Sequence, residues 1–416
     1  MKRTLDLRTG IPVWQAYRTP GVPTKPLTRD AAADVLVVGM GISGAMMAEA
    51  LAGDGFSVIA IDRRGPIQGS TAATTALVQF EIDQPLSLLT GKIGKERAER
   101  AWRRSRLALF NLKARIAELA IPCGASERHS LYLAGNVLDP GALREEGERR
   151  RAAGLHAIYL NRSALKERFG VDRDAALVSA GNLALDPKKL AAGLFRKAAA
   201  NGARLYAPVE ATGFATANGK VVATTRGGPS IAAETVVLAT GYELTDIVPA
   251  GGHQIISTWA IATRPQPRGL WPEEAFVWEA SNPYLYMRAT GDGRVVCGGE
   301  DEGFIDEERR DALIAEKSQR IAKKLGKLLP KLDTKPEFAW TGSFGTTSSG
   351  LPIIGRVPRH PGIFAVMGYG GNGITFSQIA SEIVRSALAG RPDRDTDLFA
   401  FAKSSGIERA AGRSRL

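Results

Sequence analysis

The chain is poor in cysteine and histidine and has no long hydrophobic run. Its 416 residues include 2 cysteines and 4 histidines, whose scatter predicts no zinc or other metal site. Cys123 and Cys297 lie far apart, which is typical of a protein of the reducing cytoplasm. No apolar run approaches the length that crosses a bilayer, and residues 1–28 lack the apolar core of a secretory signal. We therefore expect a cytoplasmic protein without a membrane span.

An excess of basic residues is the main bias in composition. The chain has 55 lysines and arginines against 43 acidic residues, a formal net charge of +12. Much of this charge lies in residues 95–106, 144–151 and 316–331, interrupted by acids or, in the last segment, by regularly spaced apolar residues. Such patterns favour helices with one solvated face over a nucleic-acid surface. A nucleic-acid partner is thus disfavoured but stays open.

The segment VLVVGMGISGAMMAEALAGDGFSVIAIDRR, residues 35–64, has the pattern of a dinucleotide-binding β-α-β unit. Gly39 permits a tight turn, Gly41 a close approach of backbone to phosphates, and Gly44 close packing of the helix on the strand. The first N–H groups of that helix would face the pyrophosphate. A second strand ends at Asp62, at the spacing of a carboxylate that binds ribose hydroxyls. The motif leaves NAD and FAD open, and Asp62 disfavours NADP because it would repel a 2′-phosphate.

Two later segments favour a flavin over a nicotinamide. Residues 236–242, VVLATGY, predict an apolar strand that ends at Thr240-Gly241, where small residues let the backbone lie against a nucleotide. Residues 368–376, GYGGNGITF, predict a second glycine-rich loop, followed by a helix over 375–389. The positive end of that helix can point at the N1–C2=O edge of a flavin ring, which becomes anionic on reduction. A nicotinamide dehydrogenase has no need of this element.

Nucleotide-binding pieces at three separated places predict two interleaved domains. We expect an α/β fold in which a Rossmann-type FAD-binding domain is interleaved with an α+β substrate domain built on an antiparallel sheet. The N-terminal arm would cover 1–30 and a basic C-terminal tail 396–416. The FAD-binding domain would comprise 31–90, 180–245 and 335–395, and the substrate domain 91–179 and 246–334.

The order of these motifs resembles that of one family. The series VVGMGISG, IDRR, GSTAATTA, YAPVEATG, LATGY, YMRATGDGRVVCGGE, WTGSFGTTSSGLPIIG and GYGGNGITFS resembles the D-amino-acid oxidase superfamily of FAD-dependent oxidoreductases, which includes glycine and sarcosine oxidases. The resemblance runs from about residue 34 to residue 390. It implies a dissociable, non-covalent FAD, because no cysteine or histidine stands where relatives bond the flavin.

The resemblance also implies cofactor contacts, position by position. The residues implied for the ADP half are Ile42, Ser43, Asp62 and Arg63. Those implied for the ribityl chain and ring are Ser70, Thr71, Thr75, Ala76 and Leu77. Val209 would contact adenine through its backbone, beside Thr240 and Gly241. The loop implied at the pyrimidine edge of the ring consists of Gly371, Asn372, Gly373, Ile374 and Thr375.

The departures from the family concern the substrate. Amino-acid oxidases of this family bind the substrate carboxylate with arginines, at positions where this chain has Phe344 and Gly371. The lysines of sarcosine oxidase fall at Thr375 and near Val296. Because burying a carboxylate without a cation is costly, either another cation replaces the arginines or the substrate lacks a carboxylate.

We expect Arg288 to be the replacing cation, although an exposed strand arginine is an equal interpretation. Tyr284 or Tyr286 would donate a hydroxyl to the substrate, and Tyr369 and Trp259 would wall the pocket.

The resemblance implies an enzyme that acts on CH-NH or CH-NH2 donors, transferring a hydride from the carbon of an amine or amino acid to flavin N5. Three alternatives stay open. The first is a tRNA-modifying oxidase of the same fold, and the second is a flavin-binding subunit of a multi-subunit amine dehydrogenase. The third is a nicotinamide dehydrogenase. A partner subunit or a homo-oligomer is compatible with each.

Overall fold

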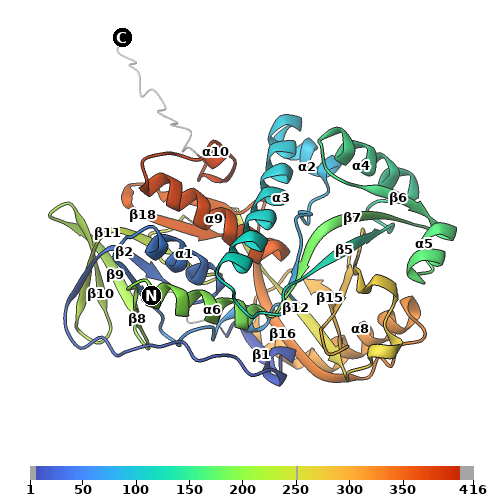
Figure 1. Cartoon of the computed structure of the whole chain (residues 1–416), viewed down its shortest axis with the longest axis horizontal. Helices are drawn as coiled ribbons and strands as arrows, with labels where there is room; N and C mark the ends of the chain where they lie inside the picture. The colour runs from blue at the N-terminus through green and yellow to red at the C-terminus, as the bar shows by residue number, and fades with distance from the viewer. Residues whose placement is uncertain (1–5, 250–251, 403–416) are drawn as a thin grey trace, which may run out of the picture.

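Two β-sheets organise the chain, and each takes strands from distant parts of the sequence (Figure 1). This computed structural model describes residues 6–249 and 252–402. In Figure 1 the smaller sheet lies at the left with α1, α6 and α9 in front of it, and the larger sheet lies at the right with α4, α5 and α8 at its edges. The fold is the mixed α/β fold that the sequence predicts.

The smaller sheet has eight strands and a parallel centre. Five strands run parallel in the order β8-β3-β2-β11-β18, and the antiparallel β17 and the β9-β10 hairpin complete it. The central strands are almost continuously apolar because helices or side chains cover both faces. The strands are β2 (Ala31–Val38), β3 (Val58–Ile61), β8 (Arg204–Tyr206), β9 (Ala211–Ala217), β10 (Lys220–Thr225), β11 (Ser230–Leu238), β17 (Ile353–Val357) and β18 (His360–Met367).

Helices α1 (Ile42–Gly53), α6 (Pro187–Ala200) and α9 (Gly373–Leu388) pack together over this sheet. Helix α6 begins with Pro187 in its first turn and Asp186 as the cap, residue types that favour a helix start. One oxygen of Asp186 accepts hydrogen bonds from the N–H groups of Lys188 (2.9 Å) and Lys189 (3.0 Å). Helix α9 begins two residues before the predicted start, within the glycine loop itself.

The larger sheet has ten strands, in the order β1-β16-β12-β15-β14-β13-β5-β7-β4 with β6 beside β7. Its pairs are antiparallel except β5 with β13, which is parallel. The strands are β1 (Arg8–Gly10), β4 (Leu77–Val78), β5 (Ser126–Leu133), β6 (Ile158–Asn161), β7 (Ala175–Ala184), β12 (His253–Thr263), β13 (Phe276–Glu279), β14 (Leu285–Ala289), β15 (Val295–Glu302) and β16 (Pro336–Thr347).

Three whole strands of the larger sheet differ from the expected domain plan, and one of them is β4, which lies in the expected FAD-binding segment 31–90. The N-terminal arm contributes β1, which pairs with β16 with Arg8 opposite Gly342. The expected FAD-binding segment 335–395 contributes β16, which pairs along most of β12. Residues 403–416 of the expected basic tail lie outside the described residues.

The remaining helices lie mainly around the larger sheet. They are α2 (Leu86–Ile93), α3 (Lys95–Glu118), α4 (Pro140–Ala152), α5 (Arg162–Phe169), α7 (Glu307–Ala312), α8 (Ile314–Leu328) and α10 (Thr396–Phe399). Gly94, with a φ of 84°, separates α2 from α3. In α8 the apolar residues Ile321, Leu325 and Leu328 are buried, so this basic helix has the solvated face that its sequence predicts. Within residues 6–249 and 252–402, no helix is long and apolar enough to cross a membrane.

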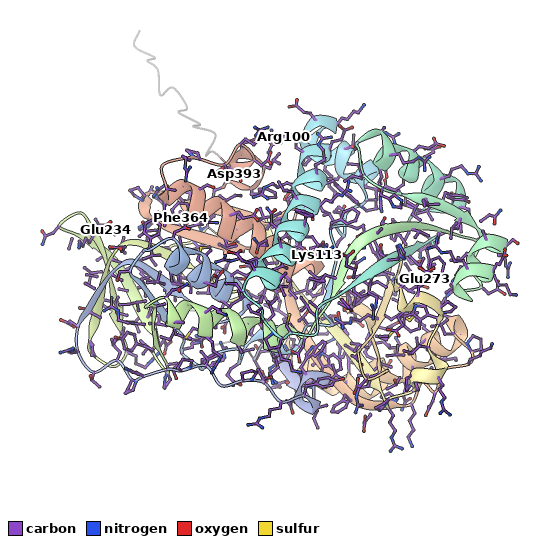
Figure 2. The ribbon with its side chains drawn as sticks, in the orientation of Figure 1. Arg100, Lys113, Glu234, Glu273, Phe364 and Asp393 are labelled. Atoms are coloured by element: carbon purple, nitrogen blue, oxygen red, sulfur yellow. The ribbon has the colours of Figure 1, made fainter. Side chains whose placement is uncertain are left out.

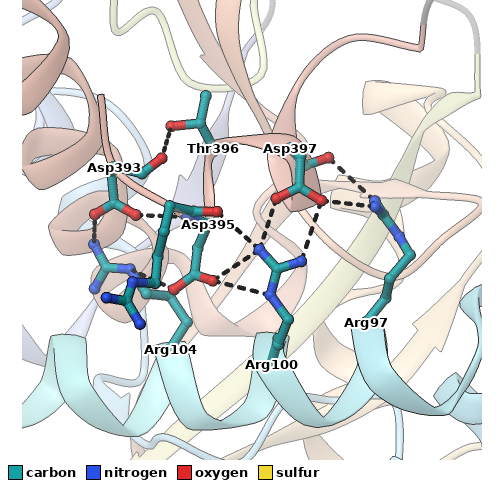
Figure 3. A network of polar contacts seen from close by, with 8 residues as sticks. Arg97, Arg100, Arg104, Asp393, Asp395, Thr396 and Asp397 are labelled. Atoms are coloured by element: carbon teal, nitrogen blue, oxygen red, sulfur yellow. Dashed lines mark hydrogen bonds and ion pairs between the residues drawn. The ribbon is translucent and has the colours of Figure 1, made fainter. Parts of the chain in front are cut away.

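An ion-pair network joins α3 to the segment after α9 (Figure 3). In Figure 2, Arg100 and Asp393 lie close together at the top of the molecule. The arginines Arg97, Arg100 and Arg104 follow one face of α3, three and four residues apart. Their carboxylate partners after α9 are Asp393, Asp395 and Asp397. This network fixes the long helix against the end of the FAD-side helix α9.

Arg104 is the buried member of this network, with only 3% of its side chain exposed. It lies 2.6 Å from Glu382 of α9 and 3.1 Å from Asp393. Arg97, by contrast, is 44% exposed and pairs with Asp397 at 2.9 Å. Removing the buried arginine would leave carboxylates without their counter-charge away from water.

We predict that Arg104→Ala lowers the free energy of unfolding by about 3 kcal/mol, the range found when one partner of a buried ion pair is removed. Arg97→Ala, at the exposed end of the network, should change it by less than about 1 kcal/mol. Urea unfolding followed by circular dichroism measures both. Equal effects of the two substitutions would contradict the assignment of the buried pair as the stabilising one.

Candidate functional site

A large cavity lies where the two sheets meet. Its volume is about 710 Å³, and its lining comes from both sheets and from the loops between them. At one end it is lined by the β2–α1 turn and by residues 239–247, which follow β11. At the other it is lined by aromatic residues of β12, β14 and β16 and by residues 369–374.

The glycines of the β2–α1 turn stand where close backbone contact requires them. A Cβ on Gly39, whose φ is 111°, would lie 2.3 Å from the carbonyl oxygen of Ala239. A Cβ on Gly44 would lie 1.9 Å from the carbonyl oxygen of Gly39. Gly44 itself does not line the cavity, and its small size lets α1 pack on the end of β2.

Asp62, at the end of β3, is fixed by backbone groups. Its carboxylate accepts hydrogen bonds from the N–H groups of Met40 (2.8 Å), Arg64 (2.7 Å) and Gly65 (3.0 Å). Arg63 and Arg64 both pair with Glu243, Arg64 at 2.6 Å. The hydrogen bond from Arg64 to Glu243 raises the pKa of Arg64, and burial opposes this shift. The positive charge that could attract a 2′-phosphate is therefore already paired.

The N-terminal ends of α1 and α9 meet at this cavity. The hydroxyl groups of Ser43 in α1 and Ser377 in α9 are 2.7 Å apart and share a hydrogen bond. Ile42 and Ser43 of one helix and Gly373 and Ile374 of the other line the cavity. Two helix N-termini thus direct their partial positive charge into one space, as the sequence predicts.

A strap of residues 77–83 ties the glycine loop to the larger sheet. Thr375 donates its hydroxyl to the carbonyl of Gln79 (2.7 Å), and Asn372 donates its amide to the carbonyl of Glu81 (2.8 Å). Asp83 closes the strap, because its N–H donates to Asn372 Oδ1 (3.0 Å) and its carboxylate accepts from the N–H of Gly371 (2.6 Å). The side chains of Thr375 and Asn372 are therefore engaged in holding the strap.

Most residues that the sequence singles out for a cofactor line the cavity. They are Gly39, Gly41, Ile42, Ser43, Asp62, Arg63, Ser70, Thr71, Thr75, Leu77, Val209, Thr240, Gly241, Gly371, Asn372, Gly373 and Ile374. Gly44, Ala76 and Thr375 do not. Ala76 lies behind the lining with its carbonyl turned to Arg288, and Thr375 is buried against the strap.

The expectation for Arg288 is wrong in both of its forms. Arg288 is neither exposed nor part of the cavity lining, since it is buried with 3% exposure. Its guanidinium donates to the carbonyls of Ala76 (2.7 Å), Leu185 (2.9 Å) and Ala289 (3.1 Å). Burial lowers its pKa to about 10. It joins β14 to the strap and to the end of β7, and nothing in its local sequence signals these carbonyl partners.

The expected aromatic walls are present at the substrate end. Tyr284 and Tyr286 line the cavity with ring centroids 5.2 Å apart, and Tyr369 packs edge-on against Tyr242 at 6.3 Å. Trp259 belongs to the lining, but its ring is fully buried on the α8 side, where its indole N–H donates to the carbonyl of Arg310 (3.0 Å) and Lys317 lies over the ring. Burial raises the pKa of each of the four tyrosines, so their hydroxyls stay protonated at neutral pH.

Asp83 is a lining residue that the sequence did not signal. Its side chain is exposed to the cavity, beside the backbone of Gly370 and Gly371. Desolvation by the surrounding protein raises its pKa, and the hydrogen bond from Gly371 opposes that shift. Of the described lining residues, only Arg63 and Arg64 carry a fixed positive charge, and both are paired with Glu243 at the Asp62 end.

The lining suits FAD. The glycine turn would let the phosphates lie against its backbone, and Asp62 would bind a ribose. The buried Ser70 Oγ and Gln79 Nε2 both belong to lining residues and form no hydrogen bond within the part of the chain that is described. Polar atoms in such positions need a partner, which the oxygens and nitrogens of the ribityl chain and ring would provide. Gln79 was also missed in the sequence, because a lone glutamine carries no pattern.

Comparison with known proteins agrees with this geometry. The family model described as DAO, FAD dependent oxidoreductase, matches residues 34–387. The chain is 26% identical to gamma-glutamylputrescine oxidoreductase of Escherichia coli, over 91% of this chain and 88% of that protein. It is 27% identical to the tRNA 5-methylaminomethyl-2-thiouridine biosynthesis bifunctional protein MnmC of Cupriavidus necator, of which it spans 60%. The structure of glycine oxidase from Geobacillus kaustophilus superposes with a TM-score of 0.74 at 21% identity, covering 90% of this chain and all (100%) of the other.

We predict that Gly44→Ala abolishes most flavin binding. The added Cβ would clash with the Gly39 carbonyl and push α1 away from the turn that receives the pyrophosphate, at a cost of about 1–3 kcal/mol for overpacking. The visible absorbance of the purified protein measures bound flavin. Gly91→Ala in α2, where no neighbouring atom lies within 4 Å, is the matched control and should keep its flavin. A yellow Gly44→Ala protein would contradict this account of the turn.

Proposed function

The chain belongs to the family of FAD-dependent oxidoreductases, and we propose that it oxidises the C–N bond of an amine that carries no carboxylate beside the reacting carbon. FAD, when bound, accepts a hydride from the carbon next to nitrogen. The residues of this chain bind the cofactor, orient the amine and exclude water from it. Oxidation of a CH-NH or CH-NH2 donor is the reaction class that this geometry supports best.

The observation that carries the proposal is the charge at the substrate end of the cavity. Asp83 faces this end, and among the described residues that line it no lysine or arginine is present. A substrate carboxylate would lie near Asp83 without a counter-charge, which is unfavourable by several kcal/mol. An ammonium group would instead form a charge-assisted contact with Asp83.

The same end of the cavity is built to enclose an apolar chain. Trp278 and Tyr286 provide aromatic faces at this end of the cavity, and Trp340 of β16 also lines the cavity. Their low polarity strengthens the attraction between a carboxylate and a cation. An alkyl amine fits this combination of one carboxylate and several aromatic faces. The relative from Escherichia coli is named gamma-glutamylputrescine oxidoreductase, and this similarity supports an alkyl amine substrate.

A tRNA-modifying oxidase is the second candidate, favoured by the similarity to MnmC and by the net charge of +12. It would require tRNA to bind across the mouth of the cavity. Such binding would weaken steeply with salt, because counterions are released when lysines and arginines contact phosphates. Filter binding of tRNA between 50 and 200 mM salt, a span over which about six phosphate contacts lower affinity roughly 1000-fold, separates this candidate from the first.

We predict that primary or secondary alkyl amines reduce the flavin under anaerobic conditions at least about tenfold faster than the matching α-amino acids, a difference that corresponds to about 1.4 kcal/mol. Stopped-flow bleaching of the visible flavin absorbance across paired substrates measures this. Faster reduction by amino acids would contradict the charge argument. A flavin that no amine or amino acid reduces would favour the flavin-binding subunit over an enzyme.

We predict that Asp83→Asn lowers kcat/KM for a cationic amine by about 30-fold. The substitution removes a hydrogen bond to a charged group, and such a bond typically contributes about 2 kcal/mol. Asparagine keeps an oxygen that can accept from the N–H of Gly371, so the strap remains closed. Asp174→Asn, on an aspartate that is 72% exposed and outside the cavity, is the matched control. An unchanged kcat/KM in Asp83→Asn would remove Asp83 from substrate binding.

A further inference from the structure

A second carboxylate, Asp301 near the end of β15, lies behind the wall of the cavity. Both of its oxygens are buried, and neither accepts a well-formed hydrogen bond from the described residues. The hydroxyl groups of Tyr284 and Thr258 face it closely enough to stabilise its charged form. Tyr284 also lines the cavity, whereas Asp301 does not. The Tyr284 hydroxyl therefore lies between the cavity and a buried carboxylate.

The charged groups around Asp301 leave it without a dedicated counter-ion. Lys317 of α8 is the nearby cation, and it pairs with Glu302 at 2.5 Å and donates to the carbonyl of Glu300 at 3.2 Å. Asp83 opposes the charge of Asp301 across the cavity. Burial, the largest influence, raises the pKa of Asp301 to about 7. Tyr286 and Thr258 complete the polar surroundings, with their hydroxyls 3.3 Å apart.

Asp83 and Asp301 differ in their hydrogen-bond donors and in their access to the cavity. Asp83 accepts a hydrogen bond from the N–H of Gly371, which stabilises its negative charge, and it faces the cavity directly. Asp301 has no such donor among the described backbone groups, and its charge is repelled by Asp83. When a proton enters this part of the site, Asp301 is the carboxylate that gains most by taking it.

An alkyl amine enters the site mostly as an ammonium ion, whose nitrogen has no free electron pair. A hydride leaves the neighbouring carbon readily only when that pair is available to stabilise the cation left behind. One proton must therefore leave the nitrogen first, and a group with a pKa near the working pH is suited to accept it.

We propose that Asp301 accepts this proton and that the hydroxyl of Tyr284 passes it on. The N–H bond of the ammonium breaks and its electron pair stays on nitrogen. The Tyr284 oxygen takes that proton while its own proton moves to Asp301, which becomes a neutral acid. One N–H of the resulting amine continues to donate to Asp83. The inference rests on the proposed function and adds a proton acceptor and a positioning hydroxyl to it.

The first test is the pH profile of flavin reduction. In the wild-type enzyme kcat/KM for an alkyl amine should rise with pH and level off above about pH 7, where Asp301 is ionised. Asp301→Asn should lose this break and fall by about 100-fold at pH 7, the contribution typical of a general base. Its rate should recover toward the wild-type value near pH 10, where the neutral amine itself is abundant. Tyr284→Phe should behave in the same way.

Glu302→Gln, on the neighbouring acid of β15 that pairs with Lys317, is the matched control and should keep the break near pH 7. An Asp301→Asn or Tyr284→Phe enzyme that keeps the wild-type break would overturn the inference, while the amine oxidation measured above would still stand. Amines that fail to reduce the wild-type flavin would instead overturn the proposed function.

The second test needs no turnover. The raised pKa means that the folded protein holds a proton on Asp301 at pH values where the unfolded chain, with the ordinary value of 3.8, has released it. The stability from this group is therefore full below about pH 4 and is lost as pH rises to about 7. The urea midpoint of the wild-type protein minus that of Asp301→Asn should fall over this interval. A constant difference would show that Asp301 does not titrate there and would also overturn the inference.

Discussion

The meeting of two helix N-termini is the constraint on which the rest of the structure depends. Helix α1 follows β2 and helix α9 follows β18, and β11 lies between these strands in the sheet. Because the strands are parallel, their carboxyl ends reach the same edge and both helices start there. The hydrogen bond between Ser43 and Ser377 fixes the two starts side by side. Residues more than three hundred positions apart thus form one surface for a negatively charged ligand.

The strap then couples this surface to the substrate end of the cavity. Gly371 belongs to the loop that starts α9, and its N–H donates to the carboxylate of Asp83. A Cβ on Gly371 would lie 2.8 Å from that carboxylate, so the glycine makes room for it. By the resemblance, this is a position where amino-acid oxidases of the family carry an arginine. At this place in the fold, Gly371 and the Asp83 carboxylate beside it therefore put a negative charge where those oxidases have a positive one.

The sequence predicted what local patterns determine. The β-α-β unit and the apolar stripe of α8 depend on residues close together in the sequence, and the structure has them. Prediction from the sequence failed for residues whose interaction partners are distant in the sequence. Arg288 is defined by the carbonyls of Ala76 and Leu185, and β1 by a strand that begins more than three hundred residues later. Asp83 and Asp301 carry no sequence motif of their own, so only the folded arrangement brings Asp83 to the cavity and Asp301 behind Tyr284 of its wall.

The net positive charge of the chain bears on how it could select the cationic amine that we propose as substrate. At +12 the molecule as a whole repels cations, and a long-range field cannot steer an ammonium ion to the cavity. Beyond about 10 Å that field is largely screened at physiological salt, whereas a contact inside an aromatic enclosure is not. Recognition must therefore come from groups that touch the substrate. Asp83 can supply it because the N–H of Gly371, in the glycine loop before α9, holds its carboxylate at the cavity.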